Sequence, residues 1–403
     1  MSLGFLCRAL AIVPALLMAA CATLDTRLPV PNAELASRAT PIDFEGVRAW
    51  GDEAPSDIAA ALRRRLPSIS RLARSDGRKN TSRSEIDILA LSGGGSDGAF
   101  GAGLLVGWTK RGDRPQFEIV TGVSAGALTA PFAFLGPRYD DQLRDIWTRY
   151  GTNQLLTAQI LPALFGGPSL ADSGPLRQLI AKYITRRVLS EIAAEYRKGR
   201  LLLILTTNLD AQRPVIWNMG EIAASRHPKA LDLFRDVLLA SASIPGALPP
   251  VKLQVAVDGQ LYDEMHVDGG TTREVFVSPI DVPFTALDRF YDAPPRRRLY
   301  IVKNGKYEAE YEPVREQALP IAARAIETLI KTQHRNDIYR IYRMAKDSGA
   351  DFNLAFVPQD FRAKPKELFD PEYQAALFEK GFELARTGRA WVKVPPDIAP
   401  RKN

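Results

Sequence analysis

Ser124 is the residue of this chain best placed to do chemistry, because it stands at the centre of Gly122-Val123-Ser124-Ala125-Gly126. A strand that turns sharply into a helix needs glycine on both sides of the turn, since a Cβ would clash there. An apolar run precedes the pentapeptide, and Ala127 and Leu128 follow it, which fits such a turn. The turn exposes the hydroxyl, and the positive end of the helix dipole favours its alkoxide. The pentapeptide therefore indicates the serine nucleophile of a hydrolase, but such short strings also occur by chance, and the rest of the chain must decide between the two.

A second glycine cluster, Gly93-Gly94-Gly95-Ser96-Asp97-Gly98, follows an apolar run and precedes a helical pattern. Gly93, Gly95 and Gly98 have the spacing of a dinucleotide-binding loop, which requires an acid at the end of the next strand. Glu118 has the required separation but lies near the start of that strand, too early to reach a ribose. Backbone N–H groups in such a loop suit an oxyanion hole instead, where each donor contributes about 3–4 kcal/mol. We therefore expect an oxyanion hole beside the serine, at the carboxyl ends of neighbouring parallel strands.

Three histidines, His227, His266 and His334, are candidates for the base that activates the serine. A triad in the order Ser, Asp, His needs its histidine on a loop after a late strand. His334 comes late, but it lies inside a long helical pattern, which predicts a residue on the helix surface. We expect His227 and His266 to be structural.

Asp268 is the better candidate for the base, because it precedes Gly269 and Gly270 in a tight turn that projects a carboxylate. The plain alternative is a turn-forming aspartate, as at Asp258-Gly259, where we expect a hairpin turn. A carboxylate is a weak base for a serine hydroxyl, and it becomes effective when burial raises its pKa. The spacing alone leaves both interpretations of Asp268 open.

Apolar runs that alternate with helical patterns predict a three-layer α/β fold to position these residues. We expect strands at 86–92, 117–121, 201–206, 214–217, 251–257 and 298–302. Helices are expected at 99–108, 125–135, 140–149, 175–198 and 231–241. Two long helices, 320–346 and 364–389, are expected to follow, with a strand at 354–358 between them. We expect the first of them to pack on the catalytic domain through Ile321, Ile326, Leu329, Ile330, Ile338 and Ile341. A lid over the site and a membrane-facing surface are the alternatives, and the spacing supports neither.

The start of the chain predicts export. Residues 1–20 carry one charge, at Arg8, and a short apolar core followed by small residues before Cys21. Such a core is shorter than the roughly 20 apolar residues of a membrane-spanning helix, and it is typical of a signal peptide. Residues 17–21 resemble a bacterial lipobox, in which the cysteine receives lipid, although Met18 stands where leucine is usual. An ordinary signal peptide with an incidental cysteine is the alternative.

Composition narrows the remaining classes. The two cysteines, Cys7 and Cys21, both lie in this leader, so no disulfide, thiol nucleophile or Cys-based zinc site is expected after processing. The hydrophobic content of 46% is that of a globular protein. The net charge of +7 comes from scattered basic residues without interleaved aromatic side chains. This pattern favours a solvated surface over nucleic-acid binding, with a milder attraction to anionic lipid headgroups.

Taken in order, Gly93–Gly98, Gly122–Gly126 and Asp268–Gly270 resemble the motifs of the patatin-like phospholipase family. The resemblance covers residues 86–300 and includes the segments 172–176, 203–210 and 239–250. It implies a three-layer α/β/α fold with a mostly parallel central sheet, and a Ser-Asp dyad without histidine. It also implies lipid or phospholipid as the substrate, with no metal and no cofactor.

Carried over to this chain, the resemblance makes Ser124 the nucleophile and Asp268 the general base. The oxyanion hole falls to the backbone N–H groups of Gly93, Gly94 and Gly95, and the remaining motif residues are Gly98, Gly122, Gly126, Gly269 and Gly270. One departure concerns Asp97, since the family usually has Arg or Lys at that position. A carboxylate there weakens the positive field near the oxyanion, which puts the preference for phospholipids in doubt.

The chain is thus expected to have a signal peptide at 1–20, a lipidated tether at 21–85, a catalytic domain at 86–305 and a mainly helical C-terminal extension at 306–403. We expect a serine acyl-ester hydrolase anchored to a membrane of the cell envelope and facing the periplasm, at the outer membrane. One alternative is a non-catalytic envelope lipoprotein that uses the fold to bind lipid or a partner. A histidine-dependent hydrolase is another.

Overall fold

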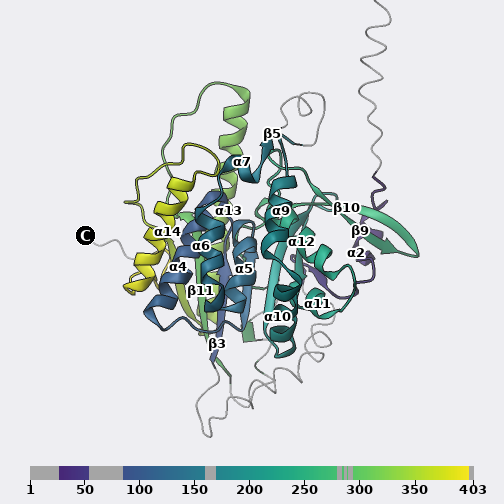
Figure 1. Ribbon diagram of the computed structural model, residues 1–403, viewed down its shortest axis with the longest axis horizontal. Coiled ribbons are helices and arrows are strands. Elements are labelled where there is room, and N and C mark those ends of the chain that lie inside the picture. The colour runs from purple at the N-terminus through teal and green to yellow at the C-terminus, as the bar shows by residue number, and fades with distance from the viewer. Residues whose placement is uncertain are drawn as a thin grey trace, which may run out of the picture.

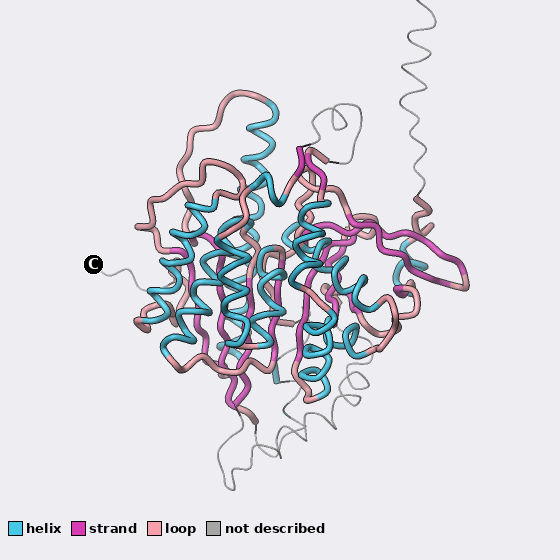
Figure 2. The backbone as a smooth tube through the Cα atoms, viewed as in Figure 1, coloured by secondary structure: helices cyan, strands magenta, loops and turns pink. Residues whose placement is uncertain are grey.

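Ten strands form one mixed sheet in the computed structural model, which describes residues 27–53, 85–158, 169–278, 284–285, 288 and 294–398 (Figures 1 and 2). The strands are β1 (Thr40–Pro41), β2 (Arg48–Trp50), β3 (Glu85–Leu91), β4 (Ile119–Val123), β7 (Leu201–Asn208), β8 (Arg213–Asn218), β9 (Val251–Val257), β10 (Gln260–Asp268), β11 (Arg296–Lys306) and β12 (Asp351–Val357). Their main order is β1-β9-β10-β7-β4-β3-β11-β12, while β8 pairs with β7 and β2 with β8. Two short strands, β5 (Thr157–Ala158) and β6 (Ala171–Asp172), form a separate pair.

The parallel part of the sheet consists of β7, β4, β3, β11 and β12, whose carboxyl ends therefore meet at one edge. The glycine loop follows β3, and the turn at Ser124 follows β4. Leu91 of β3 pairs with Gly122 of β4, so the two loops lie side by side as the sequence predicts.

The antiparallel part of the sheet contains the strand that ends at Asp268. Strands β9 and β10 form a hairpin whose last pair is Val257 with Gln260, which confirms the hairpin turn expected at Asp258-Gly259. The tip of this hairpin projects from the body of the molecule, far from α13 (Figure 1). The other end of β10 pairs with β7 and so delivers Asp268 to the centre of the sheet.

Side chains of β3 alternate between the two faces of the sheet, as a period of two residues requires. Leu89 and Leu91 join the larger apolar core, and Ile88 and Ala90 join a second core on the opposite face. The larger core is covered by α4 (Gly98–Arg111), α5 (Ala125–Leu135), α6 (Asp140–Thr148), α9 (Gly174–Tyr183), α10 (Arg186–Arg197), α11 (Met219–Ala224), α12 (Ala230–Ser241) and α14 (Pro371–Arg386). The second core packs against α13 (Ala318–Asp347). The architecture is therefore the expected three-layer α/β/α arrangement.

The helix expected at 175–198 is two helices, α9 and α10, because the chain breaks at Ile184 and Thr185. The Thr185 side chain accepts a hydrogen bond from the N–H of Val188 (3.4 Å), so it caps the second helix. The short helices α2 (Ala33–Arg38), α7 (Thr152–Leu155) and α11 were not expected.

Residues 27–53 do not form the tether that we expected over 21–85. Their strands β1 and β2 pair with β9 and β8, and the side chains of Phe44 and Val47 are buried in the larger core. Scattered prolines suggested an extended linker, but the segment gains main-chain hydrogen bonds and apolar contacts by joining the domain.

The C-terminal region is likewise integral to the sheet rather than an extension beyond residue 305. The expected strand at 354–358 is β12, which pairs in parallel with β11. Helix α14 lies so close to α4 that a Cβ on Gly103 would overlap the backbone of Phe378. Glycines at this contact let the two backbones approach, and residues beyond 305 thereby complete both the sheet and its main helical layer.

The leader, Cys7 and Cys21, and the second half of the expected tether lie outside the described residues. Within the described part of the chain, no helix is long and apolar enough to cross a membrane.

Candidate active site

Ser124 occupies a strained turn between β4 and α5, with φ of 52° and ψ of −121°. Positive φ is uncommon for a residue with a Cβ, and such strain is typical of functional turns. The N–H of Ser124 donates to Oγ of Ser241 (3.0 Å), which holds the turn in place. A Cβ on Gly126 would overlap the carbonyl oxygen of Leu91, and one on Gly122 would lie 2.6 Å from the carbonyl oxygen of Gly126. The two glycines are therefore required for β3, β4 and α5 to approach each other.

Asp268 reaches Ser124 because β4 and β10 share one edge of β7. Strand β8 occupies the opposite edge, from Leu203 to Asn208. On the shared edge Val123 pairs with Leu205, and Asp268 pairs with the next residue, Thr206. Along this edge of β7, the residues paired with β10 therefore follow directly after those paired with β4. This arrangement brings the two sequence-predicted side chains together at the same cavity.

The Asp268 carboxyl is buried and only partly satisfied. Its Oδ1 accepts a hydrogen bond from the N–H of Gly270 (2.7 Å), while Oδ2 has no partner within the described chain. Burial raises the pKa of Asp268 to about 7, and the nearby Ser124 hydroxyl and Gly270 N–H act in the opposite direction. A carboxylate with this pKa and a vacant oxygen is suited to accept the serine proton near neutral pH.

The glycine loop offers two backbone donors rather than the three expected. The N–H of Gly93 already donates to the carbonyl oxygen of Glu274 (3.1 Å), so it cannot serve an oxyanion. Gly94 and Gly95 have positive φ values of 145° and 55°, and both line the cavity that contains Ser124. The structure records no hydrogen bond from either N–H to another described residue. Gly94 and Gly95 therefore have N–H groups free to donate to a ligand in this cavity.

Asn304, at the end of β11, fixes this loop. Its Nδ2 donates to the carbonyl oxygen of Ser92 (2.8 Å), and its Oδ1 accepts from the N–H of Gly101 (3.1 Å). A Cβ on Gly94 would lie 2.5 Å from the Asn304 carbonyl oxygen. The next strand along the sheet thus presses directly against the loop, which keeps its N–H groups oriented.

Glu274 is a second buried carboxyl at the site, and the sequence did not single it out. Its Oε2 lies 2.5 Å from the position that a Cβ on Gly93 would take, and its Oε1 lies 2.6 Å from that on Gly270. The carboxyl therefore bridges the glycine loop and the turn after Asp268. Burial, reinforced by the charge of Asp268, raises the pKa of Glu274 to about 8.

A cation stands close to Asp97, the residue that departs from the family pattern. The Asp97 carboxyl accepts a hydrogen bond from the Tyr373 hydroxyl (2.6 Å), and burial raises its pKa. Lys303 also lines the cavity and is only 8% exposed. Burial lowers the pKa of Lys303 to about 8, while Glu274 and Asp97 act in the opposite direction. The site therefore contains a positive charge even though the glycine loop carries none.

The position of His334 overturns the expectation of a helix-surface residue. It is 1% exposed and lines the same cavity as Ser124 and Asp268. Neither ring nitrogen has a hydrogen-bond partner among the described residues. Burial, together with Lys303 and Lys331, lowers its pKa well below the usual value, so the ring is neutral. The 3.6-residue pattern showed its helix but could not show that this turn of α13 faces the site.

Ser124 stands where two cavities of different character meet, and Gly95 and Ile244 line both. The larger cavity, of about 280 Å³, contains most of the charged groups described above. The other is a narrow apolar cavity whose lining includes Leu128, Ile146, Trp147, Leu155, Leu156, Leu176, Leu179, Leu248, Leu368 and Phe369. One side of the nucleophile is therefore polar and the other is apolar.

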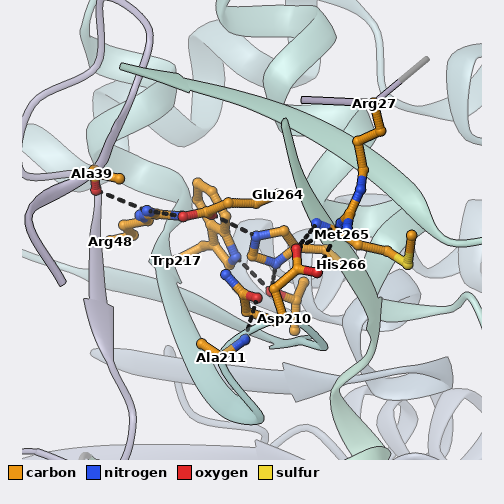
Figure 3. Close-up of polar contacts among 11 residues, drawn as sticks. Arg27, Ala39, Arg48, Asp210, Ala211, Trp217, Glu264, Met265 and His266 are labelled. Carbon is orange, nitrogen blue, oxygen red and sulfur yellow. Dashed lines mark hydrogen bonds and ion pairs between the residues drawn. The ribbon is translucent and has the colours of Figure 1, made fainter. Parts of the chain in front are cut away.

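His266 is structural, as expected, and belongs to a buried polar network (Figure 3). Its Nδ1 bonds Oγ1 of Thr206 (2.9 Å), and its Nε2 bonds Glu264 (3.0 Å). Glu264 also forms a two-bond ion pair with Arg48 of the N-terminal segment. Although burial acts to raise it, Arg48 and His266 lower the pKa of Glu264 to about 2. The network ties residues 27–53 to the strand that presents Asp268.

The site combines a three-layer α/β/α fold with a strained serine turn after β4. Residues 89–282 match the model of the family described as patatin-like phospholipase. The match contains all three motifs that carry the resemblance in the sequence.

Two solved structures resemble the chain at 12% sequence identity. One is VipD from Legionella pneumophila, with a TM-score of 0.36 over 79% of this chain and 72% of that one. The other is human GIVD cytosolic phospholipase A2, with a TM-score of 0.35 over 85% of this chain and 64% of that one. Likeness at this level bears on neither substrate nor mechanism. No curated protein matches the sequence.

Proposed function

We propose that this protein is a serine hydrolase of lipid acyl esters that works through a dyad of Ser124 and Asp268. The observation that carries the proposal is the shared edge of β7, which sets the vacant Oδ2 of a buried aspartate beside a strained serine. The raised pKa of Asp268 suits proton transfer near neutral pH.

Acylation begins when Oγ of Ser124 attacks the ester carbonyl carbon and its proton passes to Oδ2 of Asp268. The N–H groups of Gly94 and Gly95 hold the oxyanion of the tetrahedral intermediate. The ester C–O bond then breaks, and the departing alkoxide takes the proton from Asp268. In the second half, water gives a proton to Asp268 and attacks the acyl-enzyme. The fatty acid leaves, and the proton returns to Ser124.

The two cavities give the substrate an orientation. The acyl chain enters the apolar cavity, since burying each methylene contributes about 0.8 kcal/mol. The alcohol side, with its headgroup, occupies the polar cavity near Lys303 and His334. Lys303 supports phospholipid as a substrate despite Asp97, because it returns a cation to the site.

The location in the cell remains part of the proposal. The leader and Cys21 support a lipoprotein anchored to the cell envelope and facing the periplasm. This places the enzyme next to membrane lipid, which is the substrate class proposed. Radiolabelled palmitate should enter the wild-type protein and not the Cys21→Ser variant.

Purified wild-type, Ser124→Ala and Asp268→Asn proteins test the activity on short p-nitrophenyl esters and on phospholipids. Both variants should lose activity on both substrates while they keep their circular dichroism spectra. Activity at the wild-type level in either variant would exclude the dyad. If the folded wild-type protein does not react with a fluorophosphonate probe, the non-catalytic lipid-binding alternative gains support.

A further inference from the structure

Helix α13 has two halves with opposite surroundings. In the second half Ile338, Ile341 and Ala345 are fully buried against the sheet. The first half extends past the body of the molecule beside the ends of the parallel strands (Figure 1). Here Ile321, Ile326 and Leu329 are 52%, 51% and 69% exposed. The expectation that these three residues pack on the catalytic domain is therefore wrong.

The exposed half of α13 is apolar around most of its circumference. Residues 320–330 contain one arginine and one glutamate, and these two, Arg324 and Glu327, pair with each other (2.8 Å). Tyr311 and Val314, just before the helix, are 93% and 41% exposed. An open groove of about 460 Å³ runs along this surface, lined by Val314, Ile321, Arg324, Ala325, Thr328 and Leu329. We call residues 311–329 the α13 projection.

Single exposed apolar side chains are ordinary on soluble proteins, whereas a contiguous group is not. The other large exposed apolar residues of the described chain are separate in sequence, as at Leu261 in the β9–β10 hairpin. The α13 projection instead holds Tyr311, Val314, Ile321, Ile326 and Leu329 within nineteen residues. Such a surface needs an apolar phase or partner to cover it.

The same helix forms a wall of the catalytic cavity. Glu327, Ile330, Lys331 and His334 of α13 line the cavity that contains Ser124. The α13 projection is therefore continuous with the rim of the active site. Whatever covers it lies next to the place where substrate must enter.

We propose that the α13 projection inserts into a lipid surface and sets the catalytic cavity against it. The inference that lipid covers this surface rests on the proposed function. If the substrate is a membrane lipid, the bilayer that contains it also covers the rim of the active site. Residues 306–335 contain five basic and five glutamate side chains, so the segment has no net charge. Insertion is therefore driven by apolar burial, and zwitterionic lipid suffices without anionic lipid. Exposed Tyr311 is of the type that anchors at membrane interfaces.

Site-specific labelling tests the insertion without depending on catalysis. The full chain carrying Cys7→Ser, Cys21→Ser and Ser124→Ala has no thiol, no acyl anchor and no nucleophile. Leu329→Cys in this background takes a nitrobenzoxadiazole label, and Leu261→Cys provides a matched control with 55% native exposure on the remote hairpin. With phosphatidylcholine vesicles, the label at 329 should gain several-fold in fluorescence, and doxyl lipids should quench it. The label at 261 should not change. An unchanged signal at 329 overturns the proposal.

A second measurement links the surface to turnover. The variant Ile321→Ser/Ile326→Ser/Leu329→Ser should lose at least tenfold in hydrolysis of phosphatidylcholine vesicles and keep its rate on a soluble p-nitrophenyl ester. Equal rates on vesicles for this variant and the wild type contradict the proposal. The wild-type protein could instead form a dimer that the triple variant does not form, with no fluorescence change at 329 on vesicles. That result would assign the surface to a second copy of the chain and overturn the proposal. If the wild-type protein does not hydrolyse the soluble ester, that result counts against the proposed function instead.

Discussion

The N–H of Gly93 donates a hydrogen bond to the carbonyl oxygen of Glu274, and the Glu274 carboxyl lies against the turn at Gly270. The glycine loop and the Asp268 turn are thus joined through one residue. This contact removes Gly93 from the oxyanion hole and places a second titrating carboxyl next to the base. It has a direct consequence for the dependence of the rate on pH.

The rate should rise and then fall with pH. Asp268 must be ionised to accept a proton, so kcat/KM on a soluble ester should rise through its pKa of about 7. Above about pH 8, Glu274 loses its proton and Lys303 its charge, so the site becomes more negative and the rate should fall. Glu274→Gln mimics the protonated acid, so it should keep the rising limb and weaken the falling one. An unaltered falling limb would remove Glu274 from this explanation.

Stability should also depend on the protonation of Asp268. Folding raises its pKa from an ordinary value to about 7, so the stability it contributes is complete below about pH 4 and is lost as pH rises through 7. Asp268→Asn should therefore raise the free energy of unfolding at pH 8 by about 2–4 kcal/mol and leave it nearly unchanged at pH 4. Urea denaturation at the two pH values measures this. Equal effects at both would show that Asp268 is not protonated preferentially in the folded state.

Arg48→Ala should destabilise the fold strongly, because it leaves the ionised Glu264 buried without its partner. Breaking a buried pair costs about 3–5 kcal/mol, whereas an exposed pair is worth about 0–1 kcal/mol. Arg38→Ala is the matched control, since the pair of Arg38 with Asp258 is half exposed. Thermal denaturation should show a much larger loss for Arg48→Ala. Similar losses for the two variants would mean that the network in Figure 3 does not hold the N-terminal segment.

His334→Ala distinguishes the dyad from a histidine-dependent mechanism. The ring is neutral and lines the cavity, but it makes no hydrogen bond to Ser124 or Asp268. The rate of hydrolysis of a short soluble ester should stay within about threefold of wild type. General base catalysis contributes about 10²–10⁴-fold to the rate, and in the dyad Asp268 provides it. The KM for phospholipid should rise, since the headgroup side of the cavity changes. Loss of ester hydrolysis by a hundredfold would make the histidine the base.

Local patterns predicted most of the fold. The strands at β3, β4 and β7 and the helix α5 lie where apolar runs and flanking glycines indicated, because each pattern reports the local backbone. The N-terminal strands and the role of β12 were missed, since pairing over long sequence separations leaves no local signal in a short segment such as Arg48–Trp50.

The candidate site was predictable where a motif imposes a backbone shape, as at Ser124 and Asp268. Glu274 and Lys303 were missed, and His334 was wrongly expected on the helix surface, because tertiary packing alone brings them to the cavity. Lys303 had one usable signal, since it lies near the carboxyl end of a strand parallel to β3. The neutral, buried state of His334 depends on the approach of α13, which its helical pattern does not specify.

The central claim is that Asp268 removes the proton from Ser124. The rate of labelling by a fluorophosphonate, followed by intact mass and peptide mapping at pH 8, tests it most directly. We predict one adduct, on Ser124, formed about 10²–10⁴-fold more slowly in a folded Asp268→Asn variant and absent in Ser124→Ala. Labelling of Asp268→Asn at the wild-type rate, or an adduct on another residue, would contradict the account.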